Sequence, residues 1–163
     1  MAKRILVPIG RDDRADAIVP VVAALARDAG ATVRLLQVHP LQRTAFNDDA
    51  RKLPLFGYDP EAALMLQRRA LAYGHEREER IESETLQRLR EVEVLIDGVP
   101  VERRVRFGEV VEEIVREAEA FDADLIAVAE RRRPWWRPAL GRIVQRLRSQ
   151  ARVPVLSLAG AAR

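Results

Sequence analysis

The sequence contains no cysteine and no apolar run long enough to cross a membrane. The absence of cysteine excludes a disulfide framework, a thiolate metal site, a redox pair and a cysteine nucleophile. The longest apolar run, residues 17–26, is interrupted by Pro20 and falls short of the ~20 residues that a membrane-spanning helix needs. Because residues 1–5 lead directly into a strand-like pattern, we expect no signal peptide and a cytoplasmic location.

Side chains suited to catalysis are also scarce, since the chain has two histidines, three serines and three threonines. None of the serines lies in the Gly-x-Ser-x-Gly turn that exposes a serine nucleophile in hydrolases. No pair of histidines or carboxylates has the spacing of metal ligands on a strand or helix. We therefore expect that the protein is not an enzyme and that it has no catalytic residue and no metal site.

Acidic residues are missing from the last fifth of the chain. Residues 131–163 contain nine arginines and no acid, for a charge of +9, whereas residues 1–130 contain 19 basic and 25 acidic residues, for a charge of −6. The net charge of +3 therefore belongs to the C-terminal segment. Of the 28 basic residues 26 are arginine, whose planar guanidinium suits phosphates and carboxylates.

Segments typical of strands and of helices alternate along the chain. A nearly continuous apolar run at residues 4–10 is typical of a strand that is covered on both faces of a parallel sheet. The order of the elements predicts a single domain, residues 1–163, with a doubly wound, Rossmann-like, five-stranded parallel sheet and helices on both faces. Further strands are expected at residues 32–38, 99–107, 123–129 and 153–158, and helices at residues 15–29, 61–96, 111–121 and 140–150.

Several glycines and prolines refine this outline. Gly30 suits the left-handed residue that ends the first helix, and Pro20 is expected to bend that helix. Gly74 is expected to kink or break the long helix. Pro100 places the alternating strand at an edge of the sheet. Residues 39–60 lack periodicity and contain several prolines, which predicts a surface excursion or lid.

Ligands of this fold bind beyond the carboxyl ends of the strands, where several polar residues are expected. His39 ends the second strand, where it either meets a ligand or hydrogen-bonds to the backbone. Asp12, Asp13 and Asp16 follow the first strand, and they either meet a ligand or cap the next helix.

The loop at residues 130–140 is rich in arginine and contains Trp135 and Trp136. One interpretation is an anion site, because backbone N–H groups at the start of a helix favour phosphate. In a second interpretation the tryptophans pack on the domain or on another subunit. A nucleic-acid surface is disfavoured because no recognised reading motif is present. The arginines concerned are Arg131, Arg132, Arg133, Arg137 and Arg142.

Seven short segments match one known family: Ile5-Leu6-Val7-Pro8, Ala26-Arg27-Asp28-Ala29-Gly30, Val38-His39-Pro40, Phe107-Gly108-Glu109, Ala123-Asp124-Leu125-Ile126, Leu140-Gly141 and Val153-Pro154-Val155-Leu156. Together they make the chain resemble the universal stress protein family over roughly residues 3–158. The resemblance implies the strand order 3-2-1-4-5 and a homodimer joined through the last strand. It also implies a role in the stress response, and some similar proteins bind ATP while others do not.

The chain departs from the ATP-binding members of that family. These members place an aspartate that contacts adenine after the first strand, where this chain has Gly10. Their phosphate motif, Gly-x2-Gly-x9-Gly-Ser/Thr, falls here on Ala129, Arg132, Gly141 and Arg142. Glycines let backbone N–H groups approach a phosphate in conformations that a side chain blocks. The resemblance therefore implies a degenerate nucleotide site that does not bind ATP in the usual pose.

These observations favour a dimeric regulatory or interaction module without a required cofactor. The alternative is a module that binds ATP or another anionic metabolite through the arginine-rich loop, and nucleotide hydrolysis is a weaker third hypothesis. An open space between Gly10, Val38 and Gly141 favours a ligand, whereas a space filled by a tryptophan or an arginine favours a protein partner. The candidate ligand residues are Pro8, Ile9, Gly10, Val38, His39, Ala129, Arg131, Arg132, Gly141 and Arg142, and the candidate dimer residues are Val153, Val155, Leu156, Ser157 and Leu158.

Overall fold

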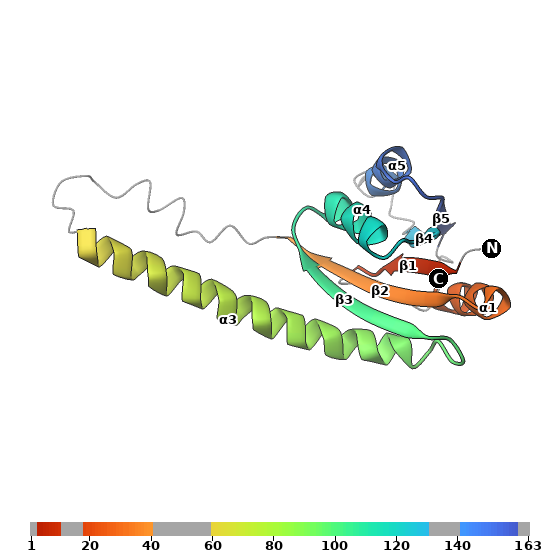
Figure 1. Ribbon diagram of the computed structural model, residues 1–163, viewed down its shortest axis with the longest axis horizontal. Helices are drawn as coiled ribbons and strands as arrows, with labels where there is room; N and C mark the ends of the chain where they lie inside the picture. The colour runs from red at the N-terminus through yellow and green to blue at the C-terminus, as the bar shows by residue number, and fades with distance from the viewer. Residues whose placement is uncertain (1–2, 11–17, 41–59, 131–140, 160–163) are drawn as a thin grey trace.

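The computed structural model describes residues 3–10, 18–40, 60–130 and 141–159. In these ranges strands and helices alternate around one sheet (Figure 1). The elements are β1 (Arg4–Pro8), α1 (Val19–Ala29), β2 (Thr32–His39), α3 (Pro60–Glu93), β3 (Val101–Phe107), α4 (Val110–Ala120), β4 (Leu125–Glu130), α5 (Gly141–Gln150) and β5 (Val155–Ala159). The expected excursion at residues 39–60 falls almost entirely outside the described residues.

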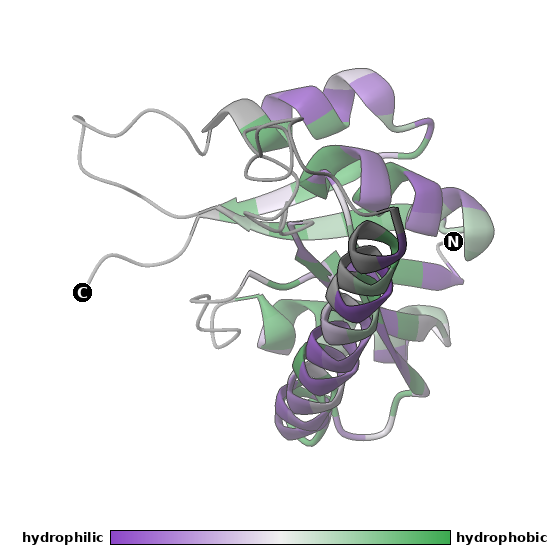
Figure 2. Cartoon of the chain, turned by 90° about the vertical axis from the view of Figure 1, so that its left-hand side faces the viewer, coloured by the Kyte–Doolittle hydropathy of each residue, from purple (hydrophilic) through white to green (hydrophobic). Residues whose placement is uncertain are grey.

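The five strands form a parallel sheet in the order β3-β2-β1-β4-β5, which confirms the predicted topology. The central strand, β1, is apolar on both faces because both faces are covered. Ile5 packs in a cluster with α1 and the C-terminal part of α3, and Leu6 packs in a second cluster with α4 and α5. Hydrophobic residues accordingly gather on the strands, whereas α3 is mostly hydrophilic (Figure 2).

The first helix agrees with one expectation and corrects another. Gly30 takes φ 61° and ψ 38° at the end of α1, which is the left-handed conformation expected of a C-terminal glycine. The prediction of a bend at Pro20 is wrong, because α1 begins at Val19 and Pro20 lies in its first turn. There the missing N–H of proline has no helical partner to lose, so the ring fits without distortion.

The long helix α3 is uninterrupted over 34 residues, so the kink or break expected at Gly74 is wrong. Its C-terminal part packs on the sheet through Thr85 and Leu89, which are buried. Its N-terminal part projects away from the sheet (Figure 1) and leaves Leu71 and Tyr73 exposed. No helix among the described residues is both long enough and apolar enough to cross a bilayer.

Candidate functional site

The carboxyl ends of β1 and β2 bring together five of the predicted site residues. Pro8 ends β1 beside Leu36 of β2, and the Ile9 N–H donates to the Leu36 carbonyl oxygen at 2.8 Å. Gly10 therefore lies near the end of β2. The remaining two, Val38 and His39, are the last residues of β2. β1 lies between β2 and β4, so the order of the strands reverses there. Ligands of such folds bind at this switch point, beyond the carboxyl ends of the strands.

A side chain of α3 lies across this edge. The Nη2 of Arg88 donates to the carbonyl oxygen of Gly10 at 3.2 Å and also to Oε1 of Gln37. Arg88 therefore joins the last turns of the long helix to the ends of two strands. In the sequence nothing distinguishes this residue from its arginine neighbours on α3, and reasoning from the sequence missed it.

The same edge holds a buried histidine. His39 is 5% exposed, and its Nε2 lies 3.0 Å from Nε2 of Gln37 and 2.9 Å from Oγ1 of Thr85. Its ring stacks on Phe107 with 5.7 Å between the centroids. Of the two interpretations of His39, the structure favours a buried structural role, although these partners are side chains.

The polar side chains at this edge form a chain from Arg88 through Gln37 to His39. A guanidinium only donates, so Arg88 fixes Oε1 of Gln37 as the acceptor and turns the amide NH₂ of Gln37 toward His39. The Thr85 hydroxyl on the other side of Nε2 donates to the Ile81 carbonyl oxygen at 2.6 Å. Arg88 thus orients Gln37, and Gln37 orients His39.

Most of the residues predicted to lie near a phosphate are outside the residues that the structure describes. Arg131, Arg132 and both tryptophans lie in residues 131–140, which the structure does not describe. Ala129 is partly buried in β4, and Gly141 and Arg142 are the first two residues of α5. Among the described residues, the arginine beside Gly10 is Arg88 of α3.

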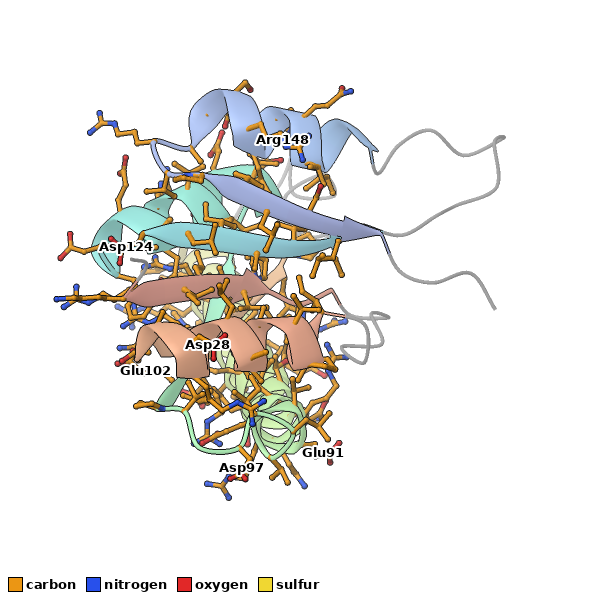
Figure 3. All side chains as sticks on the ribbon, turned by 90° about the vertical axis from the view of Figure 1, so that its right-hand side faces the viewer. Asp28, Glu91, Asp97, Glu102, Asp124 and Arg148 are labelled. Carbon is orange, nitrogen blue, oxygen red and sulfur yellow. The ribbon has the colours of Figure 1, made fainter. Side chains whose placement is uncertain are left out.

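The predicted dimer residues lie at the β5 edge of the sheet. All five are partly exposed. Ser157 accepts a hydrogen bond from Nη2 of Arg148 at 2.8 Å, and Val155 packs against the cluster under α4 and α5. Arg148 lies on α5 above this strand (Figure 3). The β5 edge therefore presents both apolar and polar side chains.

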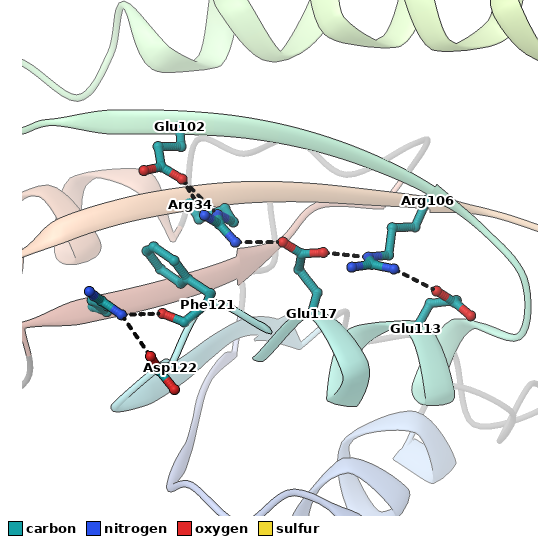
Figure 4. Close-up of polar contacts among 8 residues, drawn as sticks. Arg34, Glu102, Arg106, Glu113, Glu117, Phe121 and Asp122 are labelled. Carbon is teal, nitrogen blue, oxygen red and sulfur yellow. Dashed lines mark hydrogen bonds and ion pairs between the residues drawn. The ribbon is translucent and has the colours of Figure 1, made fainter. Parts of the chain in front are cut away.

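A second polar cluster fixes α4 to the sheet. Glu117 is 2% exposed, and its Oε1 accepts from Nη1 of Arg34 at 2.7 Å while its Oε2 accepts from Arg106 (Figure 4). Arg34 also pairs with Glu102 and lies 3.9 Å above the centre of the Phe121 ring. The heptad-like pattern of α4 predicts its apolar face but not these buried acids, whose partners come from distant strands.

The start of α4 is capped by Glu109. Its side chain accepts a hydrogen bond from the Glu112 N–H at 2.9 Å and pairs with Arg146 of α5 at 3.0 Å. The Glu112 N–H holds the pKa of the Glu109 carboxyl below its usual value, and Arg146 lowers it further. This cap orients the helix that follows β3.

Two hollows in the described part of the molecule lie away from the carboxyl ends of the strands. One, of about 810 Å³, lies between α3 and β3, and the other, of about 430 Å³, lies beside α4. No three metal-binding side chains come together within the described ranges. The arrangement at the strand ends is thus a hydrogen-bonded edge crossed by Arg88.

The fold and this edge define an open, doubly wound α/β domain of the kind that binds ligands at its strand ends. The model of the universal stress protein family matches residues 1–158, and the chain belongs to that family. A search among curated proteins finds no significant match.

Solved structures agree with this fold. The hypothetical protein MJ0577 is similar with a TM-score of 0.69 and 18% identity, over 99% of this chain and 98% of that chain. Universal stress protein UspA from Lactobacillus plantarum is similar with a TM-score of 0.58 and 18% identity, over 96% and 97%. A universal stress protein from Archaeoglobus fulgidus is similar with a TM-score of 0.56 and 18% identity, over 96% and 98%.

Proposed function

We propose that this chain is a dimeric regulatory or interaction module of the stress response, that it is not an enzyme, and that its nucleotide site does not hold ATP in the family's usual pose. The observation that carries the proposal is Arg88. Its guanidinium is hydrogen-bonded to the Gly10 carbonyl and to Gln37, at the position where the resemblance implies that ATP-binding members use an aspartate. An arginine held at this edge supports a protein partner over a nucleotide.

The alternative is a site for a nucleotide or another anionic metabolite. A universal stress protein solved in complex with cAMP is similar in fold, with a TM-score of 0.54 and 14% identity over 99% of this chain and all of that chain. The five arginines of residues 131–142 favour this alternative, because guanidinium groups can bind phosphate without a glycine-rich loop.

Titration calorimetry with ATP separates the two functions. We expect wild-type protein to bind ATP with a dissociation constant weaker than about 1 mM, because the glycine positions carry Ala129 and Arg132. Gly141→Ala is expected to change nothing, and Gly74→Ala on the exposed part of α3 is the matched control. Micromolar ATP affinity that Gly141→Ala abolishes and Gly74→Ala preserves would contradict the proposal. Incubation with Mg-ATP should yield no ADP above a protein-free control.

The dimer is tested at Leu156 of β5. An apolar, half-exposed edge strand presents unpaired backbone groups that favour pairing with the strand of another chain. We expect light scattering to give a dimeric mass for the wild type and a monomeric mass for Leu156→Lys, because the new charge lies at the paired edge. Leu71→Lys, which places the same charge on the exposed part of α3, should leave the dimer intact. A monomeric wild type, or a dimer broken by Leu71→Lys instead, rules out the β5 interface.

A further inference from the structure

The outer strand at the other end of the sheet, β3, presents a free backbone edge. The Pro100 carbonyl accepts from the Val33 N–H at 2.9 Å, and the Gly108 N–H donates to the His39 carbonyl at 2.9 Å. Even-numbered residues of β3 therefore direct their backbone groups toward β2, and alternate residues direct theirs away from it. Val101, Arg103 and Val105 thus present N–H and C=O groups to the open side, and none of these groups has a backbone partner in the described ranges.

A groove runs beside this open edge. Its volume is about 810 Å³, and its walls come from one flank of α3 and from the first residues of β3. Figure 3 labels Glu91 of α3 and Asp97 of the following turn at the bottom of the view, and Glu102 of β3 at its left. The lining residues are Ser83, Leu86, Gln87, Arg90, Glu91, Val94, Val101, Glu102 and Arg103.

The helix wall of the groove has an apolar spacing that suits an extended chain. Leu86 and Val94 lie eight residues apart on or just beyond α3, which corresponds to about 12 Å at 1.5 Å per residue. Side chains four residues apart on a strand are about 13 Å apart and point to the same face. Val94 is 75% exposed, so its side chain is available for such a contact.

The charge on β3 indicates which chain fits. The strand carries Arg103, Arg104 and Arg106 against a single acid, Glu102. Antiparallel pairing with a second copy about Arg103 or Arg104 would place that arginine opposite its own copy, which is unfavourable. Arg104 is exposed and has no ion pair among the described residues, whereas Arg103 and Arg106 pair with glutamates. An acidic strand complements this edge better than another copy of the chain.

We propose that the groove between α3 and β3 binds an extended, acidic segment of another protein, which pairs with β3 as a sixth strand. Apolar side chains of that segment lie against Leu86, Val94 and Val101, and acidic side chains on its other face lie opposite Arg104. The proposal deepens the interaction function and rests on it, but it involves neither the Gly10 edge nor ATP. The two tests therefore fail independently.

Fluorescence anisotropy with labelled octapeptides tests the charge and the pattern. An amidated peptide of alternating valine and glutamate should bind the wild type more tightly than a peptide of alternating valine and lysine, or one with the same valines and glutamates in two blocks. Arg104→Glu should weaken the first peptide about two- to tenfold, the size of a reversed cross-strand charge pair. Arg77→Glu, the same change on the exposed part of α3, should leave it unchanged. Equal binding of all three peptides overturns the proposal.

Hydrogen exchange measured residue by residue tests the backbone pairing. The amides of Arg103 and Val105 should exchange quickly in the free protein and slow down at least tenfold with the valine–glutamate peptide. The amides of Glu102 and Arg104, which face β2, should be protected with and without peptide. Unchanged exchange at Arg103 and Val105 overturns the proposal, and so does protection in the free protein that rises with protein concentration, since a second copy would then occupy the edge.

Discussion

Replacement of Glu117 by alanine is expected to lower the free energy of unfolding by about 3 kcal/mol. The carboxylate is buried and accepts from Arg34 and Arg106 on two different strands. Without it, both guanidiniums lose a charged acceptor beneath α4. The loss stays at the lower end of the range for buried ion pairs because Arg34 retains Glu102 and Arg106 retains Glu113.

Urea unfolding followed by circular dichroism measures this loss, and Glu119→Ala is the matched control on the same helix. Glu119 is 55% exposed and lies 3.9 Å from Arg152, so its removal should cost less than about 0.5 kcal/mol. Similar midpoints for both variants would show that the buried cluster contributes no more than a surface pair. A smaller dependence of the unfolding free energy on urea concentration, for Glu117→Ala alone, would instead indicate that the substitution changes the compactness of the unfolded or folded state.

Replacement of Gly108 by alanine is expected to destabilise the fold by about 1–3 kcal/mol. A Cβ atom there would lie 2.7 Å from Cγ of Glu113 and 2.9 Å from its Oε1. Glu113 cannot move away freely because Arg116 holds it at 2.7 Å. The backbone of Gly108, with φ 156°, also lies in a region that side chains rarely adopt.

Gly74→Ala is a control with the opposite expected sign. A Cβ at Gly74 meets no atom within 4 Å, and the residue lies inside α3. Alanine should therefore stabilise the helix by up to about 1 kcal/mol. Thermal unfolding of the two variants beside the wild type measures both effects. A Gly108→Ala protein as stable as the wild type would show that the turn between β3 and α4 relaxes without cost.

Local patterns in the sequence were sufficient to predict the sheet. The apolar run of β1 indicates a strand that is buried on two faces, and the alternation of β3 indicates a strand with one exposed face. The glycine after α1 indicates a left-handed residue at the end of that helix. Their order along the chain then leaves few topologies. The fold class was therefore predictable from local patterns, whereas the strand order 3-2-1-4-5 was implied by the family resemblance.

The polar contacts were not predictable because they join residues far apart in the sequence. Arg88 contacts Gly10 across 78 positions, and Arg34 contacts Glu117 across 83. In a chain with 26 arginines, no local pattern marks those that are bonded to strand ends or to buried acids. The apolar periodicity of α4 does not indicate that Glu113 and Glu117 are buried, because it depends on apolar residues and not on paired charges.

The errors at Pro20 and Gly74 have a common origin. Both residues were treated as interruptions of a helix, although their effect depends on where the helix begins and what surrounds it. Pro20 lies in the first turn, where no hydrogen bond is lost. Gly74 lies inside an uninterrupted helix, and a Cβ there would meet no atom within 4 Å, so the glycine costs helix propensity and causes no distortion.

Because α3 is long and is held near one end, a small rotation there displaces its other end by a large distance. The helix is held at Thr85, Arg88 and Leu89, and its other end, at Pro60, is about 44 Å from Leu89 at 1.5 Å per residue. A rotation of about 5° at the held turns would move that end by about 4 Å. A force applied at the far end of α3 would accordingly act with a large mechanical advantage on Arg88 and the strand ends it holds.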